Sequence, residues 1–296
     1  MKYHDVESLQ RKFNFLSVEN LFPEMGTNSK IKCLLEIDQA GFLNPRNLIL
    51  AQQMIANKQG CKIVDDIVIQ IEHCIKQNIS KLKTSTKEVF HAKKILLCTG
   101  ASTVFDSFLP SDMKLDLVLK SQEVLLVEVT ENDRERLHYM PSIIVHEGDA
   151  DMGQDCYVLP PLLYPDGKFY LKIGHCKVDE FDISSEKEMY TWYCGQGKPA
   201  TAKRLAHLIH RICPGLKPLS LQSDTCVTLT TPTNQLYCDM VTPNFGILIG
   251  GNGGGAKSSD EIGRIGAKMI LKGEWDYDLP WQSFRAKWRS KQMCAL

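Results

Sequence analysis

Gly250-Gly251-Asn252-Gly253-Gly254-Gly255-Ala256-Lys257-Ser258-Ser259 is the stretch that decides how the fold of this chain is interpreted. It joins an apolar run, residues 245–249, to an amphipathic stretch, residues 259–272, so the pattern predicts a strand, a glycine turn and a helix. Backbone N–H groups at such a junction, together with the helix dipole, favour a negatively charged ligand. Three consecutive glycines are more than a turn requires, and they indicate close approach to a ligand.

The same stretch fits three alternatives, which stay open. The spacing Gly251-x-Gly253-x-x-Ala256 fits a relaxed dinucleotide fingerprint, but no second strand with an acidic residue follows it. The run from Gly251 to Ser258 approaches a phosphate-binding loop, although Ala256 stands where a glycine belongs and few residues follow. The plainest alternative is a flexible turn without a ligand.

Composition excludes several classes of protein. The 296 residues carry 35 Lys and Arg against 35 Asp and Glu, so no excess charge attracts nucleic acid. No apolar run approaches the roughly 18 residues of a membrane helix, and we expect no membrane partner. The 11 cysteines include no C-x-x-C pair, so we expect neither a metal site nor a disulfide framework.

Targeting signals are weak. Charged residues stand among the first 15, where a signal peptide would be apolar, which predicts a cytoplasmic protein. The C-terminal Cys294-Ala295-Leu296 is loosely similar to a peroxisomal address but lacks its basic middle residue. A peroxisomal location is therefore the second possibility.

Periodicity predicts a chain of mixed α/β and α+β character. Asn44-Pro45 is a cap followed by proline at the first helical position, and Tyr164-Pro165-Asp166-Gly167 is a turn that joins two antiparallel strands. Predicted helices span residues 44–60, 198–211 and 259–272. Predicted strands span residues 61–64, 67–71, 81–85, 88–91, 95–101, 115–130, 142–146, 155–159, 168–175, 220–230, 235–240 and 245–249.

Several segments, taken in order, resemble the D-amino-acid-oxidase-like FAD-dependent oxidoreductases, nearest to monomeric sarcosine oxidase and pipecolate oxidase. The resemblance runs from about residue 8 to residue 275. It rests on residues 41–51, Gly60-Cys61-Lys62, Val68, residues 97–101, Tyr157-Val158-Leu159-Pro160, residues 171–175, Asp224-Thr225-Cys226-Val227-Thr228, and the glycine cluster with Lys257 and Gly263.

The resemblance implies a domain organisation. Residues 44–110 and 220–275 would form an incomplete Rossmann-like FAD-binding domain, and residues 1–43 and 111–219 an inserted substrate domain on a mixed, mostly antiparallel sheet. Residues 276–296 would be a tail. The family begins with a Gly-x-Gly-x-x-Gly unit that residues 1–45 do not contain. We therefore expect a fragment or alternative product of a longer gene, or a degenerate form.

The resemblance also implies roles for individual residues. Cys226 would attach the flavin covalently, Lys172 would promote the reaction with O₂, Lys257 would bind the substrate carboxylate, and His175 would be a further catalytic candidate. Lys257 is also an implied cofactor contact. The remaining implied cofactor contacts are Val68, Gly100, Gly251, Asn252, Gly253, Gly254 and Gly255. Each main candidate also has a plainer interpretation, because Cys226 can be one more buried cysteine and the two lysines can simply face solvent.

Two departures weaken a sarcosine assignment. The chain has His175-Cys176 where the family has a tyrosine followed by a histidine, and Thr228 where the family has a tyrosine. We predict oxidation of the C–N bond of a small amine or amino acid, with hydride transfer to flavin N5 and O₂ reduced to H₂O₂, by a monomer. A dehydrogenase is the close variant. A non-catalytic or truncated remnant that acts as a binding protein is the alternative, and a nucleotide-binding module is the third.

Overall fold

The computed structural model describes residues 2–17, 31–38, 40–74, 79–106, 108–110, 113–146, 155–174 and 177–289. The chain forms two compact units, each built from several segments. Unit 1 comprises residues 1–43, 121–181 and 190–226, and unit 2 comprises residues 44–120, 182–189 and 227–296.

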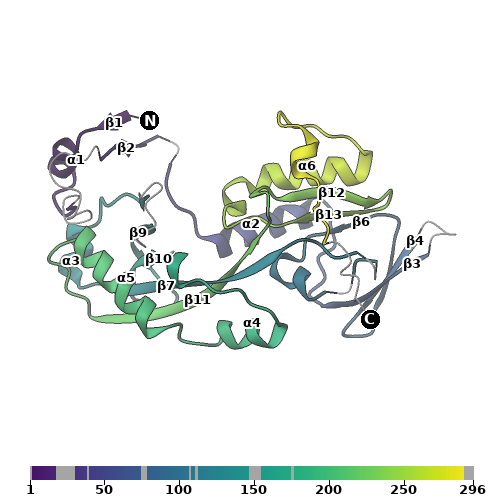
Figure 1. Ribbon diagram of the computed structural model, residues 1–296, viewed down its shortest axis with the longest axis horizontal. Coiled ribbons are helices and arrows are strands. Elements are labelled where there is room, and N and C mark those ends of the chain that lie inside the picture. The colour runs from purple at the N-terminus through teal and green to yellow at the C-terminus, as the bar shows by residue number, and fades with distance from the viewer. Residues whose placement is uncertain are drawn as a thin grey trace, which may run out of the picture. The chain divides into compact units, whose positions relative to one another are not determined.

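Unit 1 is built on a five-stranded sheet of order β11-β7-β10-β9-β8 (Figure 1). The neighbours β7–β10, β10–β9 and β9–β8 pair antiparallel, as predicted. The strands are β7 (Val118–Glu128), β8 (Ile143–Val145), β9 (Cys156–Leu163), β10 (Phe169–Gly174) and β11 (Ser220–Thr230). The other elements are β1 (Lys2–His4), α1 (Val6–Lys12), β2 (Cys33–Leu35), α3 (Glu131–Arg136) and α5 (Pro199–Ile212), while α4 (Glu186–Tyr193) begins in unit 2.

The core of unit 1 lies between one face of this sheet and α5. Its helix side is Leu205, Leu208, Ile209 and Ile212, and its sheet side is Leu125, Val127, Val158, Leu171 and Ile173. Successive side chains of a strand point to opposite faces. The residues that alternate with these, including Lys172 and Tyr157, therefore lie on the face away from α5.

Unit 2 contains two three-stranded sheets. One has the order β12-β13-β6, with β12–β13 antiparallel and β13–β6 parallel. Helix α6 lies against this sheet (Figure 1). Its Ile265 and Met269 share a hydrophobic core with Cys238 of β12. These elements are β6 (Ile95–Leu97), β12 (Tyr237–Thr242), β13 (Phe245–Ile249) and α6 (Ser259–Lys272). The second sheet is the antiparallel meander of β3 (Val68–Cys74), β4 (Ile79–Thr84) and β5 (Val89–Ala92).

Helix α2 (Pro45–Lys58) of unit 2 exposes most of its apolar surface. None of its residues is buried, and Ile49, Leu50, Met54 and Ile55 are each 55–56% exposed. It is tied to α6 through Gln52, whose amide donates to Asp260 Oδ1 over 2.6 Å. A helix with apolar residues on all sides usually lies inside a protein, so this exposure is unusual.

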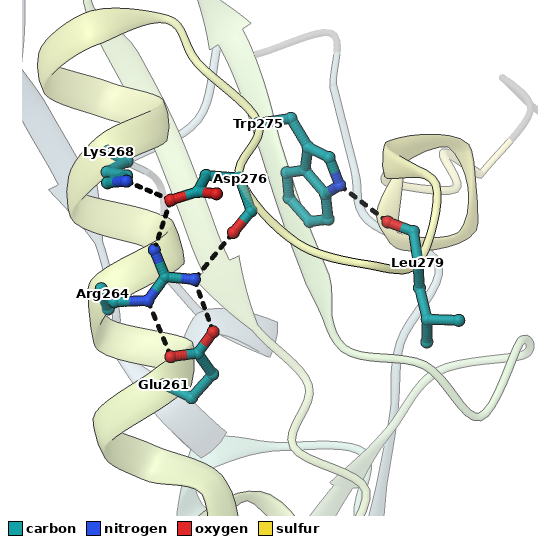
Figure 2. Close-up of polar contacts among 6 residues, drawn as sticks. All are labelled: Glu261, Arg264, Lys268, Trp275, Asp276 and Leu279. Carbon is teal, nitrogen blue, oxygen red and sulfur yellow. Dashed lines mark hydrogen bonds and ion pairs between the residues drawn. The ribbon is translucent and has the colours of Figure 1, made fainter.

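The segment after α6 is fastened to that helix. Arg264 bridges Glu261 and Asp276, and Lys268 also contacts the Asp276 carboxylate (Figure 2). The indole N–H of Trp275 donates to the Leu279 carbonyl over 2.8 Å. These contacts hold the turn that leads into the last described segment.

Most of the predicted elements are confirmed, including the helices at Pro45–Lys58, Pro199–Ile212 and Ser259–Lys272 and the strand at Phe245–Ile249. The strand predicted at 61–64 is wrong, because this segment is an exposed coil. Beside it the Asp66 carboxylate accepts a hydrogen bond from the backbone N–H of Ile67 over 2.7 Å, and such local side-chain bonds compete with a strand ladder. The short helices α1, α3 and α4 were not predicted.

Candidate functional site

The parallel pair in unit 2 brings two glycine turns to one edge of the sheet. Ile247 of β13 pairs with Leu97 of β6, and both strands end shortly afterwards. Strand β6 leads into Gly100, and β13 leads into the glycine cluster. Because parallel strands place their carboxyl ends at the same edge, Gly100 and the cluster lie at that edge. Ligands of open α/β sheets bind there.

The glycine cluster is a tight turn with open space beside its last members. Gly250 has φ +82°, and a Cβ on it would lie 2.5 Å from Thr231 Cγ2, so only glycine fits. A Cβ on Gly255 would meet no atom within 4 Å, and a Cβ on Gly254 only the Gly251 carbonyl oxygen at 3.7 Å. The turn therefore leaves room for a group to approach its backbone in front of α6.

Asn252 is used by the turn itself. Its amide donates to the Gly250 carbonyl over 2.6 Å, and its Oδ1 accepts from the Thr231 N–H over 2.8 Å. Its backbone N–H donates to the Leu229 carbonyl over 3.2 Å. Asn252 thus shapes the cluster and fastens it to Leu229 of β11. The cofactor contact that the resemblance implies for Asn252 stays a prediction.

The remaining candidates of unit 2 lie in different elements, and not all of them are near the glycine turns. Lys257 is exposed in the short 3-10 helix Gly255–Ser258 that precedes α6. Val68 begins β3, in the antiparallel meander rather than in the sheet that carries the glycine turns. Thr228 packs beside the cluster, 3.6 Å from the position of a Cβ on Gly253.

Unit 1 gathers a second group of candidates on the sheet face opposite α5. The ammonium of Lys172 lies 5.9 Å from the centre of the Tyr157 ring. Cys226 is close enough that the Lys172 cation lowers the pKa of its thiol, against a larger rise caused by burial around the sulfur. The structure therefore brings Lys172 and Cys226 together, although they are 54 residues apart in the sequence.

Tyr157 is a member of this group for which the sequence predicts no role. Burial raises the pKa of its phenol to about 12, and nearby Cys226, Tyr164 and Asp224 add to the rise. The phenol stays protonated at neutral pH and can donate a hydrogen bond. In the pairing of β9 with β10, Gly174 lies opposite Tyr157 and Lys172 lies opposite Leu159, so Tyr157 is diagonally across from Lys172. The sequence does not reveal this register, and it therefore gave no reason to place Tyr157 in the group.

The backbone at Cys226 is held by Trp192. The indole N–H donates to the Cys226 carbonyl over 2.8 Å, and the Thr225 hydroxyl donates to the Trp192 carbonyl over 2.7 Å. Both bonds fix the strand where the candidate attachment residue stands. Cys226 is an exposed residue, although enough atoms surround its sulfur to raise the pKa of the thiol.

Some expectations concern residues outside the described part of the chain. His175 and Cys176 lie there, as do Cys294-Ala295-Leu296. Within the described ranges, no three His, Cys, Asp or Glu side chains are grouped so that they could hold a metal ion. The helices described are all too short or too polar to cross a membrane.

Comparison with known proteins defines the class. The model of the FAD-dependent oxidoreductase family named DAO matches residues 3–269, which is most of the chain. The chain therefore belongs to the DAO family of FAD-dependent oxidoreductases, as the sequence resemblance implied. No curated protein matches it.

Solved structures share the fold. The fructosyl peptide oxidase from E. terrenum superimposes with a TM-score of 0.67 at 15% identity, over 96% of this chain and 64% of that one. NikD, an unusual amino acid oxidase essential for nikkomycin biosynthesis, gives 0.62 at 14% identity over 95% and 71%. The FAD-bound L-alpha-glycerophosphate oxidase from Mycoplasma pneumoniae gives 0.61 at 17% identity over 95% and 68%. Across eight such matches the chain spans 57% to 71% of the other protein's length.

FAD is the cofactor of this family. Its fit to this chain rests on the open side of the glycine turn, where Gly254 and Gly255 leave space in front of α6. Backbone N–H groups before a helix suit an electron-rich or anionic part of a cofactor. The residues of unit 2 that would hold it are Gly100, Gly251, Gly253, Gly254 and Gly255.

Proposed function

We propose that this chain oxidises the C–N bond of a small amine or amino acid with FAD and passes the electrons to O₂, giving H₂O₂. The observation that carries the proposal is the grouping of Lys172, Cys226 and Tyr157 on one face of the unit 1 sheet, in a chain of the DAO family. FAD, when bound, accepts the hydride from the carbon next to the amine nitrogen.

Lys172 is proposed to act on oxygen. A fixed positive charge stabilises the negative charge that develops when O₂ takes up an electron. Its half-buried position beside the Tyr157 ring supports this role, because a cation withdrawn from bulk water acts more strongly than a solvated one.

Lys257 is proposed to bind the substrate carboxylate. It is exposed near the start of α6, where a cation is opposed by the helix dipole. A carboxylate ligand would relieve that conflict, and N–H groups of the turn would add to the binding.

Cys226 is proposed to attach the flavin through a thioether. Cys226 is an exposed residue of β11, and the Trp192 and Thr225 hydrogen bonds fix its backbone. A covalent link would hold the cofactor independently of the contacts that bind its adenine half. His175, which follows β10 in the sequence, is proposed as a further catalytic group.

The substrate class follows from the same residues. A small amine or imino acid that carries a carboxylate, such as pipecolate, suits Lys257 as the ligand of that carboxylate. Thr228, in place of the tyrosine of sarcosine oxidases, argues for a substrate other than sarcosine itself.

The test is the visible spectrum of the purified chain after acid precipitation. A flavin that stays with the pellet in the wild type and in Cys194→Ala, but not in Cys226→Ala, supports covalent attachment, since Cys194 is a second exposed cysteine of unit 1. Lys172→Met should slow peroxide formation far more than anaerobic flavin reduction, whereas exposed Lys203→Met should change neither. A colourless protein that takes up no added FAD would overturn the proposal for this chain.

The second candidate is a binding protein derived from such a flavoprotein. It is favoured by the sheet of unit 2, in which β6 has β13 on one side and no described strand on the other. The exposed apolar residues of α2 favour it as well. A well-folded, flavin-free chain would support this candidate.

A further inference from the structure

Unit 1 contains a small polar cavity that none of the proposed roles uses. Its volume is about 10 Å³, and its walls include Ser121, Glu123, Asp179, Trp192 and Thr201. One water molecule needs a cavity with roughly 10–15 Å³ open to its centre. The space is therefore matched to a single small molecule.

One wall of the cavity is a hydroxyl without a partner. Thr201 is 2% exposed, and its Oγ1 makes no hydrogen bond to the described residues. A buried hydroxyl that bonds to nothing destabilises the folded state. Thr201 lies in the first turn of α5 and is one of its buried residues, so its hydroxyl has no access to bulk solvent.

A second wall of the cavity is the Glu123 carboxylate, which can accept further hydrogen bonds. Glu123 is 6% exposed and accepts from the Lys198 N–H and from the Ser223 hydroxyl, each over 2.8 Å. A carboxylate has about four acceptor sites. It is also rigid, because it fills the space beside Gly197, where a Cβ would lie 2.3 Å from Glu123 Oε1.

We propose that this cavity binds one structural water molecule. The water accepts from the Thr201 hydroxyl and donates to the Glu123 carboxylate, which satisfies both groups. A cation is the poorer occupant, because the Asp179 carboxylate already pairs with Arg204 and no metal-binding group of side chains is found among the described residues. Trp192, whose indole N–H donates to the Cys226 carbonyl, forms another wall of the cavity.

Thr201→Val tests the proposal through the sign of its effect on Tm. Valine keeps the shape and removes the hydroxyl. If water is bound, the variant removes the hydroxyl that donates to this water, and Tm falls by a few degrees. If the cavity is dry, the variant removes an unsatisfied hydroxyl and Tm stays the same or rises, which would overturn the proposal. Thr201→Ser is the control that keeps the hydroxyl, and it should retain the water.

A crystal structure of the wild type at better than about 2 Å provides the independent measurement. A density peak within hydrogen-bond distance of Thr201 Oγ1 and of the Glu123 carboxylate is the expected result. An empty cavity in a well-ordered unit 1 would refute the water site whatever the Tm values. Neither measurement depends on flavin binding, so the outcome is separate from that of the proposed function.

Discussion

A Cβ on Gly174 would lie 2.9 Å from the hydroxyl oxygen of Tyr157 and 2.6 Å from Val124 Cγ1. The phenol therefore occupies the space that any other residue at this position would need. Glycine in a strand interior usually weakens the strand, and close approach of another group is a common reason for it. Here it lets the Tyr157 ring lie beside Lys172 on the candidate face of the sheet.

Gly174→Ala should destabilise the protein by about 1–3 kcal/mol through overpacking. The measurement is the free energy of unfolding in urea. Gly255→Ala is the matched control, since a Cβ there meets no atom within 4 Å, and it should leave the stability within about 0.5 kcal/mol of the wild type. Equal stabilities of the two variants would contradict the packing argument.

Tyr157 should make the folded state sensitive to alkali. Its pKa is raised from 10 to about 12, so between these pH values the unfolded chain releases a proton that the folded chain retains. The free energy of unfolding then falls as pH rises above 10, by about 1–2 kcal/mol at pH 12. Tyr157→Phe should lose this part of the pH dependence.

The control for that experiment is Tyr139→Phe, which removes an exposed phenol. It should keep the alkaline fall of the wild type. If Tyr157→Phe and the wild type lose stability in parallel from pH 10 to 12, the phenol is not protected from ionisation in the folded state.

The reactivity of Cys226 should depend on Lys172. Burial raises the pKa of this thiol and the lysine cation opposes the rise, so Lys172→Met should raise the pKa further. In protein free of flavin, alkylation of Cys226 by iodoacetamide at pH 8 should slow by about threefold to tenfold, because the thiolate is the reactive form. Peptide mass spectrometry follows the rate, and Lys203→Met should leave it unchanged. An unaltered rate in Lys172→Met would show that the two groups do not interact.

Two aspartates near the C-terminal segment should differ in their contribution to stability. Asp239 is 5% exposed and accepts from the N–H groups of Met240 and Ala286, so Asp239→Ala leaves buried donors unpaired and should cost about 2–4 kcal/mol. Asp276 pairs with Arg264 and Lys268 at the surface, where solvent screens the charges, so Asp276→Ala should destabilise the protein much less than Asp239→Ala. Urea unfolding measures both. A larger effect at Asp276 would mean that the network in Figure 2 governs the segment.

The sequence predicts the elements better than it predicts the site. Alternation identified β10 and the turn before it, because the pattern of Leu171, Lys172 and Ile173 follows from local geometry. The approach of Tyr157 to Lys172 depends on the irregular register between Tyr170 and Lys172, which no local pattern encodes. The hydrogen bond from the Thr231 N–H to Asn252 Oδ1 joins residues 21 positions apart, so no local pattern predicts it. The cofactor contact of Asn252 stays a prediction. The predicted roles of Cys226 and Lys257 remain predictions.

The bare surface of α2 bears on how the protein behaves in solution. Ile49, Leu50, Met54 and Ile55 form exposed apolar area on a chain whose net charge is zero at pH 7. Without net charge, molecules do not repel one another, and exposed apolar area then favours self-association. The solubility minimum should fall at neutral pH, where the sequence pI of about 7.0 lies. Purification a unit or more away from that value, at low ionic strength, should keep the chain dispersed.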